Sequence, residues 1–318
     1  MVKTIQYLLI CLTCTTVSVP TFANNSRSPT DASPHHAFMQ ASHPLLNARS
    51  RSGSSARLGG GQRMTLAGLN VIVWQPESLK QQASSPAPLV IFSHGYHGDN
   101  SLSVFLMKAL AQEGYLVVAP NHKDALSNGF TKKQIRFGKP DSWSENTYKD
   151  REEDIKHLIG ALRNDETWRA KIDWSKLALV GHSLGGYTVL GLAGAWPSWK
   201  LPGIKAVLAL APYTNPYLKR ETLGEIDVPV MYQCGTRDIW INMFVKGKNG
   251  AFNKTPSPSV YVEFDNASHF TWTNLNVSPH RKDLVCHYSL EFLNKYVKGD
   301  SMANPEEKLS GVSTLQTK

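Results

Sequence analysis

The spacing of apolar and polar positions predicts a chain in which strands and helices alternate. Short apolar runs typical of buried strands occupy residues 87–94, 115–120, 177–180, 204–212, 228–235 and 259–264, and residues 65–76 predict one or two earlier strands. Helical spacing predicts helices within 101–114, 146–165, 184–196 and 281–297. Alternation of this kind favours an α/β fold with a mostly parallel central sheet and helices on both faces.

The ends of the chain differ in composition from this alternating region. Residues 1–23 carry a short basic start, an apolar stretch and small residues before a cleavage point, which predicts a signal peptide and a secreted or periplasmic protein. A retained membrane anchor is the alternative. Residues 24–62 are rich in Ser, Pro and His and predict a flexible leader. The catalytic domain is then expected at 63–300, followed by a flexible tail at 301–318.

Composition and charge narrow the classes of molecule that the protein is expected to bind. The chain has 318 residues, 41% of them hydrophobic, and a formal net charge of +9 at pH 7. This charge favours weak contact with anionic surfaces. The basic residues form no stripe interleaved with aromatic residues, so we expect no nucleic-acid binding. We expect a monomer that needs no metal or cofactor.

The stretch GHSLG at 181–185 places Ser183 between a predicted strand and a predicted helix. At a sharp strand-to-helix turn, glycines avoid collisions and the serine hydroxyl projects from the end of the sheet. A helix N-cap serine is the alternative interpretation. The surrounding pattern favours a nucleophile at Ser183.

A serine nucleophile needs an imidazole to accept its proton and a carboxylate to orient that imidazole. Asp238 follows the predicted strand 228–235, and His269 follows the strand 259–264. Reactive residues of such sheets gather at the carboxyl ends of the strands. The sequence therefore predicts the triad Ser183, Asp238 and His269. Two other carboxylates, Asp265 and Asp227, are weaker alternatives for the acid.

The oxyanion of the transition state requires two donors. We assign one to the backbone N–H of Leu184, directly after the nucleophile, and the other to the N–H of Tyr96 in the loop after residues 87–94. The Tyr96 side chain is expected to line the acyl site. Three nearby imidazoles are expected to be scaffold or wall residues that point away from the nucleophile: His94, His97 and His182.

The connection 121–149 is long and contains Phe130, Phe137 and Trp143. Long loops above such a sheet often shape the entrance for substrate. Trp272 lies three residues after the predicted catalytic histidine. We expect these aromatic residues to form an apolar wall, with Trp272 binding substrate.

Four cysteines occur, two of them, Cys11 and Cys14, inside the predicted signal peptide. The exported protein would keep Cys234 and Cys286, which can form a disulfide in an oxidising compartment. Two buried free thiols are the alternative.

A set of short motifs extends these predictions: FSHGY, APNHKD, DREEDI, GHSLGG, GTRD and ASHFTW. Together they resemble the secreted platelet-activating factor acetylhydrolase and dienelactone hydrolase-like branch of the α/β-hydrolases, and more distantly bacterial cutinases and polyester hydrolases. The resemblance covers residues 66–297. His182 stands where several polyester hydrolases carry Trp.

The resemblance implies a cofactor-free serine esterase of the α/β-hydrolase fold, with Ser183, Asp238 and His269 as its triad. The expected substrates are small-molecule or lipid esters with short to medium acyl chains. A serine peptidase, amidase or acyltransferase is the alternative. A binding module without catalytic activity is a further alternative.

Overall fold

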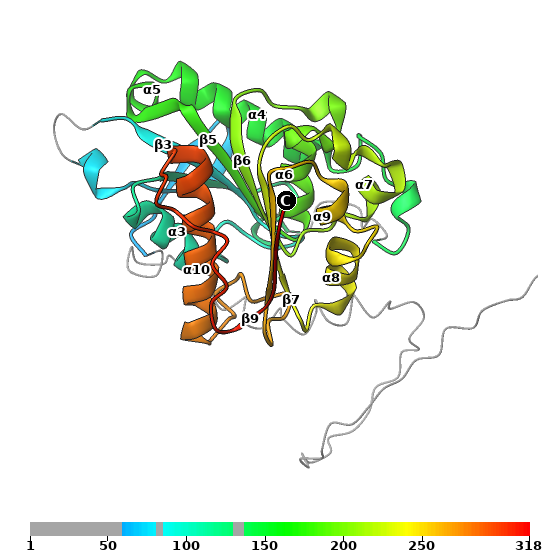
Figure 1. The fold of residues 1–318 in the computed structure, drawn as a ribbon. Helices are drawn as coiled ribbons and strands as arrows, with labels where there is room; N and C mark the ends of the chain where they lie inside the picture. Colours follow the sequence, from blue (N-terminus) through cyan, green and yellow to red (C-terminus); the bar gives the residue numbers. More distant parts are fainter. Residues whose placement is uncertain (1–58, 81–84, 130–136) are drawn as a thin grey trace, which may run out of the picture. The chain divides into compact units, whose positions relative to one another are not determined.

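The computed structural model describes residues 59–80, 85–129 and 137–318 (Figure 1). The predicted signal peptide and nearly all of the predicted leader lie outside the described residues, as does Phe130. Within the described residues, no helix combines the length and the apolar character needed to cross a membrane.

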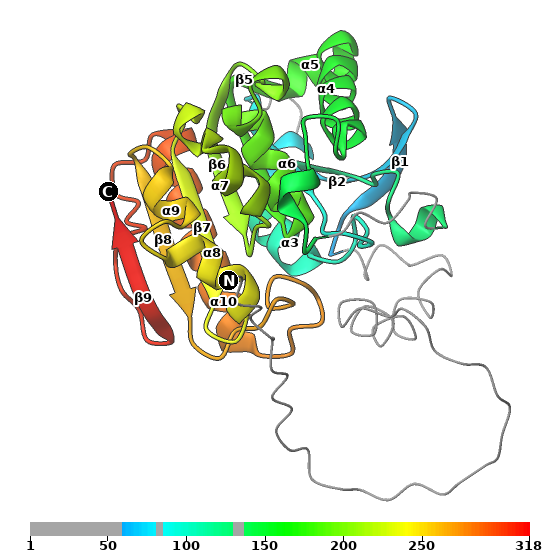
Figure 2. The same cartoon turned by 90° about the vertical axis from the view of Figure 1, so that its right-hand side faces the viewer.

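A nine-stranded sheet organises the described residues in the order β1-β2-β4-β3-β5-β6-β7-β8-β9. The strands are β1 (Gln62–Leu66), β2 (Leu69–Trp74), β3 (Ala87–Ser93), β4 (Leu116–Pro120), β5 (Ile172–His182), β6 (Ile204–Leu210), β7 (Val230–Gly235), β8 (Ser259–Phe264) and β9 (Val312–Thr317). The run from β4 to β8 is parallel, whereas β1, β2 and β9 pair antiparallel at the two edges (Figure 2). The predicted α/β fold with a mostly parallel sheet is confirmed.

Helices cover both faces of this sheet. On one face α3 (Val104–Gln112) and α10 (Pro279–Leu293) lie side by side, and their apolar residues share one buried cluster with β-strand residues (Figure 1). The second cluster receives apolar side chains from the remaining helices: α4 (Lys149–Asn164), α5 (Glu166–Lys171), α6 (Leu184–Leu190), α7 (Asn215–Arg220), α8 (Ile239–Lys246) and α9 (Ala251–Lys254). The central strands are therefore apolar on both faces, as their continuous hydrophobic runs predict.

Local residues explain where α4 begins and ends. Tyr148 adopts a left-handed conformation with φ 60°, so the helix begins at Lys149 rather than at the predicted residue 146. At the other end, the Asp165 side chain accepts a hydrogen bond from the Trp168 N–H and caps the next helix, α5. The predicted helix at 146–165 is thus confirmed, with its start three residues later.

The C-terminal segment corrects the prediction of a flexible tail at 301–318. Strand β9 pairs antiparallel with β8, and the Thr314 hydroxyl donates to Glu263 Oε2 at 2.9 Å. Edge strands gain stability from main-chain hydrogen bonds and tolerate polar side chains. The polar composition of this segment therefore hides its strand. At the other end, β1 begins at Gln62, inside the predicted leader.

The two cysteines within the described residues are free thiols, so the predicted disulfide is wrong. Cys234 is buried in the cluster beneath α4 and α6, whereas Cys286 packs against the cluster beneath α3 and α10. The sheet separates the two side chains. Burial raises the pKa of both thiols, which keeps them protonated and unreactive.

Candidate active site

Ser183 occupies the sharp turn between β5 and α6. Its φ is 56° and its ψ is −114°, a backbone conformation that is rare for a residue with a side chain. The turn is held by main-chain hydrogen bonds: the Ser183 N–H donates to Leu210 O at 2.9 Å, and Ser183 O accepts from the N–H groups of Tyr187 and Tyr213, each at 3.1 Å. Neighbouring structure therefore stabilises the strained nucleophile turn.

The two glycines that flank this turn have no room for a side chain. A Cβ on Gly181 would collide with the carbonyl of Gly185, and a Cβ on Gly185 would collide with the carbonyl of Ser93. Both obstacles are backbone atoms, which cannot move aside. The glycine spacing around Ser183 thus follows from close contact among β5, α6 and β3.

The three residues predicted as a triad meet at the carboxyl ends of the strands. His269 Nε2 lies 2.9 Å from Ser183 Oγ, and His269 Nδ1 lies 2.7 Å from Asp238 Oδ2. Asp238 is buried and follows β7, while His269 is partly exposed and follows β8. The imidazole can therefore accept the serine proton at Nε2 while it donates its Nδ1–H to the carboxylate.

The alternative acids lie elsewhere. Asp227 forms an exposed ion pair with Lys200, with 2.7 Å between Oδ2 and Nζ. Asp265 is exposed, and its backbone N–H donates to Gly311 O at 2.8 Å. The geometry favours Asp238 as the acid.

Hydrogen bonds join the loop that carries the acid to the loop that carries the histidine. The Arg237 N–H donates to Ala267 O at 2.9 Å, and the Asn266 N–H donates to the Thr236 hydroxyl at 2.9 Å. Because these bonds connect residues next to Asp238 and His269, they fix the separation of the two functional side chains.

His182 supports the backbone of His269. Its Nε2 lies 2.8 Å from the carbonyl oxygen of His269, so Nε2 carries the proton and donates it to that carbonyl. Burial, followed by the neighbouring His269, lowers the pKa of His182 to about 3. His182 therefore stays neutral and acts on the His269 backbone, as expected for a scaffold residue.

Neutral buried histidines make the stability of the protein depend on pH. Burial also lowers the pKa of His94 below its usual value. Because unfolded His182 and His94 bind protons near pH 6.5 and the folded protein does not, the free energy of unfolding should fall as pH decreases from 6.5 toward 3. The slope contributed by each histidine approaches about 1.4 kcal/mol per pH unit.

Urea unfolding measured between pH 4.5 and 7.5 tests this expectation. His182→Gln keeps a donor near the position of Nε2 but cannot titrate. In this variant the slope of the unfolding free energy against pH should be smaller by about 1.4 kcal/mol per pH unit between pH 4.5 and 5.5. An unchanged slope would mean that His182 is protonated in the folded protein.

Trp272 corrects the expectation of a substrate-binding wall. Its side chain is fully buried in the cluster beneath α3 and α10, and its Nε1–H donates to Gln233 Oε1 at 3.0 Å. Although Trp272 is close to His269 in sequence, its side chain packs into the core and is not exposed to substrate. Trp143 is likewise fully buried.

Of the two residues assigned to the oxyanion site, Leu184 directly follows Ser183 in sequence, and Tyr96 follows Gly95, which lies against Ser183. Leu184 is buried at the first position of α6, and Tyr96 lies in the loop after β3. The half-buried Tyr96 ring stacks on His97 with 3.7 Å between centroids and meets the edge of Phe137 at 5.2 Å. Burial raises the pKa of Tyr96 to about 12, so its phenol stays neutral. The role of the two N–H groups remains a prediction.

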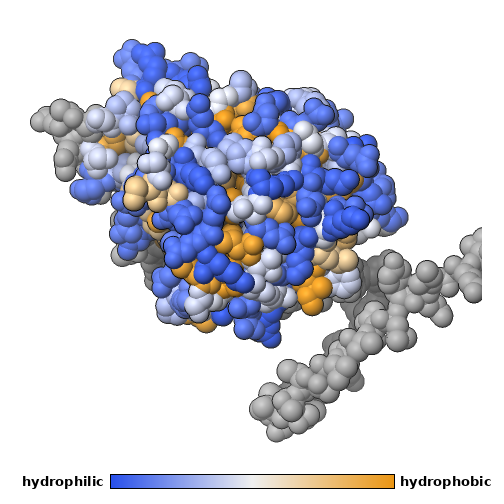
Figure 3. Space-filling view, in the orientation of Figure 1, coloured by the Kyte–Doolittle hydropathy of each residue, from blue (hydrophilic) through white to orange (hydrophobic). Residues whose placement is uncertain are grey.

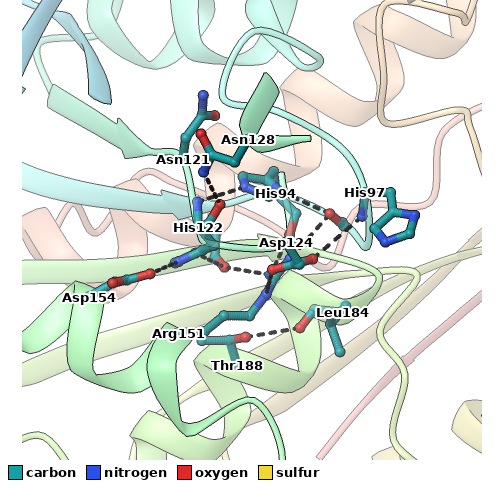
Figure 4. Close-up of polar contacts among 12 residues, drawn as sticks. His94, His97, Asn121, His122, Asp124, Asn128, Arg151, Asp154, Leu184 and Thr188 are labelled. Atoms are coloured by element: carbon teal, nitrogen blue, oxygen red, sulfur yellow. Dashed lines mark hydrogen bonds and ion pairs between the residues drawn. The ribbon is translucent and has the colours of Figure 1, made fainter. Parts of the chain in front are cut away.

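A buried polar network behind the Tyr96 loop was missed in the prediction of site residues. Its centre is an ion pair between Arg151 on α4 and Asp124 after β4, with both side chains fully buried (Figure 4). Beside it, His122 Nδ1 lies 2.9 Å from Asp154 Oδ2 and His122 Nε2 lies 2.9 Å from the Ser93 hydroxyl. The sequence did contain a sign that Arg151 is buried, because Arg151 has the helical spacing of the buried residues Ile155, Leu158 and Leu162.

Comparison with known proteins agrees with this architecture. The sequence model of the Chlorophyllase family matches residues 70–227. Cutinase est2 of Thermobifida alba is 27% identical over 214 residues, which are 67% of this chain and 60% of the relative. Cutinase 1 of Thermobifida cellulosilytica and a cutinase of Thermobifida fusca (strain YX) are also 27% identical over 214 residues, which cover 69% and 60% of those proteins.

The Chlorophyllase match covers the strands from β2 to β6 and the turn at Ser183. The chain spans 60% of the length of the Thermobifida alba relative. The sheet order, the turn at Ser183 and the similarity to these families agree with one another. The chain has the α/β-hydrolase fold and is similar to proteins of the chlorophyllase family and to cutinases.

Proposed function

We propose that this protein is a serine hydrolase that cleaves carboxylic esters through an acyl-enzyme. The observation that carries the proposal is the position of His269, with Nε2 2.9 Å from Ser183 Oγ and Nδ1 2.7 Å from Asp238 Oδ2. The distant relationship to cutinases supports an ester rather than another substrate class.

The reaction follows from these contacts. Ser183 Oγ attacks the ester carbonyl carbon while its proton moves to His269 Nε2, and Asp238 stabilises the imidazolium. The N–H groups of Tyr96 and Leu184 bind the oxyanion of the tetrahedral intermediate. When the C–O bond of the ester breaks, the alcohol leaves with the proton from Nε2. A water molecule then attacks the acyl-enzyme by the same route and releases the acid.

Exposed apolar side chains next to the acid indicate the substrate class. Three of them lie on α8 immediately after Asp238: Ile239 (66% exposed), Trp240 (77%) and Met243 (50%). In Figure 3 a hydrophobic patch lies at the lower right, where Figure 1 places α8. We therefore propose apolar acyl groups of short to medium length, in simple esters or in lipids, with α8 supplying the wall first assigned to Trp272.

This assignment predicts a selective effect of Trp240→Ser. The Michaelis constant for a nitrophenyl hexanoate should rise about tenfold, whereas that for nitrophenyl acetate should change little, because only the longer chain reaches the lost apolar surface. Met302→Ser removes another highly exposed apolar side chain (86% exposed), which is not on α8, and is the control. Equal effects of Trp240→Ser on both esters would place the acyl chain elsewhere.

A series of nitrophenyl esters of increasing acyl length, measured beside amide and phospholipid substrates, tests the reaction class. We expect turnover of esters, with little or none of amides. Faster amide cleavage would indicate a peptidase or amidase, and acyl transfer to added alcohols exceeding hydrolysis would indicate an acyltransferase. No turnover of any substrate would indicate a binding module.

We also propose that the protein is exported and acts as a monomer, with weak attraction to anionic surfaces. The apolar stretch and predicted cleavage point in residues 1–23 support export, and the net charge of +9 supports the attraction to anionic surfaces. Sequencing of the mature N-terminus tests export, and a start near Asn24 is the expected result.

A further inference from the structure

The proposed mechanism does not use the buried polar network behind the Tyr96 loop. Arg151 is fully buried and forms five hydrogen bonds, which match the five N–H donors of a guanidinium. Nε and Nη2 bind the two carboxylate oxygens of Asp124 at 2.8 and 2.7 Å. The planar fork of Arg151 is therefore held in one orientation.

The remaining donors of Arg151 bind the loop that carries Tyr96. Nη1 donates to His94 O at 2.7 Å and to the Ser93 hydroxyl at 3.4 Å, and Nη2 donates to Gly95 O at 3.3 Å. The Gly95 carbonyl also accepts from His94 Nδ1 at 2.7 Å and from the Gly98 N–H at 3.0 Å. Two consecutive carbonyls thus point toward the buried guanidinium.

The carbonyl of Gly95 belongs to the same peptide unit as the N–H of Tyr96. In a planar trans peptide the two groups point in opposite directions, so fixing one fixes the other. Gly95 also lies against the nucleophile, because a Cβ added to it would be 3.4 Å from Ser183 Cβ and 3.1 Å from His182 Nδ1. A carbonyl held toward Arg151 therefore directs the Tyr96 N–H away from the interior, beside Ser183.

We propose that Arg151, oriented by Asp124, is a positioning residue that aims the Tyr96 N–H at the oxyanion. The inference rests on the proposed esterase function. His94 supports the same peptide: Nδ1–H donates to Gly95 O, and Nε2 accepts from the His122 N–H at 3.0 Å. The ion pair holds the loop in its reactive conformation before substrate binds, which is how an oxyanion site lowers the activation barrier.

Arg151→Lys tests the proposal, because lysine keeps the charge beside Asp124 but lacks the planar fork. The value of kcat should fall about 100-fold with an unchanged Michaelis constant, since loss of one oxyanion donor costs 10²–10³. Phenylboronic acid forms a tetrahedral adduct with the serine, so its inhibition constant should rise by a similar factor. Asp124→Asn, which is isosteric, should show the same two changes.

Tyr115→Phe is the control for general loss of buried polar contacts. It removes the hydrogen bond from the Tyr115 hydroxyl to Asn294 Oδ1, 3.0 Å long, which joins the segment after α3 to the end of α10. This variant should lower Tm without changing kcat or boronate affinity. Folding of each variant is checked by circular dichroism.

The proposal is wrong if folded Arg151→Lys and Asp124→Asn keep kcat and boronate affinity within threefold of wild type. It is also wrong if only the Michaelis constant changes. If neither variant folds, the Arg151–Asp124 ion pair serves only the stability of the protein, and the positioning role is overturned. If wild type lacks esterase activity, the proposed function itself fails. An active wild type with unaffected variants refutes the positioning role only.

Discussion

Ser183→Ala is expected to lower kcat for nitrophenyl esters by several orders of magnitude, on the order of 10⁶-fold. The reason is the loss of the proposed attacking atom, Ser183 Oγ, which lies 2.9 Å from His269 Nε2. The fold should be preserved. The hydrogen bonds that hold the turn come from the Ser183 backbone, and alanine carries the same Cβ at the same positive φ.

Ser175→Ala is a suitable control for this experiment. Ser175 is an exposed serine of β5 whose hydroxyl binds Asp173 rather than any proposed catalytic residue. The kcat of the Ser175→Ala variant should equal that of wild type within experimental error. If Ser183→Ala kept turnover within tenfold of wild type while folded, Ser183 would not be the nucleophile.

Asp238→Asn is expected to lower kcat by about 10⁴-fold. Asparagine can donate its amide N–H to His269 Nδ1 and so stabilise the tautomer whose Nε2 already carries a proton. That imidazole cannot accept the proton of Ser183. The fold should again persist, because Asp238 stands at the N-cap position of α8 without a side-chain capping bond.

Asp265→Asn provides the comparison for the acid. Asp265 lies between β8 and His269 but is exposed. Its variant should retain near-normal kcat. The opposite pattern, with Asp238→Asn active and Asp265→Asn inactive, would exchange the roles of the two carboxylates. Steady-state kinetics at saturating ester distinguish the two results.

Local sequence patterns predicted the parts of the site that depend on chain order. The run LALV, the glycines around Ser183 and the two post-strand positions of Asp238 and His269 follow from strand periodicity and turn chemistry. In a parallel sheet the carboxyl ends of neighbouring strands meet at one edge. For that reason, residues 86 positions apart in sequence, Ser183 and His269, could be predicted to approach each other.

Features that depend on which face a side chain occupies were harder to predict. Trp272 lies close to His269 in sequence but packs beneath α3 and α10, and Cys234 and Cys286 lie on opposite faces of the sheet. Arg151 has the helical spacing of the buried residues of α4, but the acceptors that bind its five N–H donors could not be identified from the sequence. Strand β9 is stabilised by pairing with β8, which a polar local sequence does not reveal.

Covalent labelling tests the central claim most directly. Wild-type protein treated with a fluorophosphonate and digested should yield one modified peptide, with the added mass on Ser183, as determined by tandem mass spectrometry. Because His269 Nε2 lies 2.9 Å from Ser183 Oγ, labelling should be fast and should disappear in Ser183→Ala. A modified residue other than Ser183, or labelling that persists in Ser183→Ala, would contradict the account.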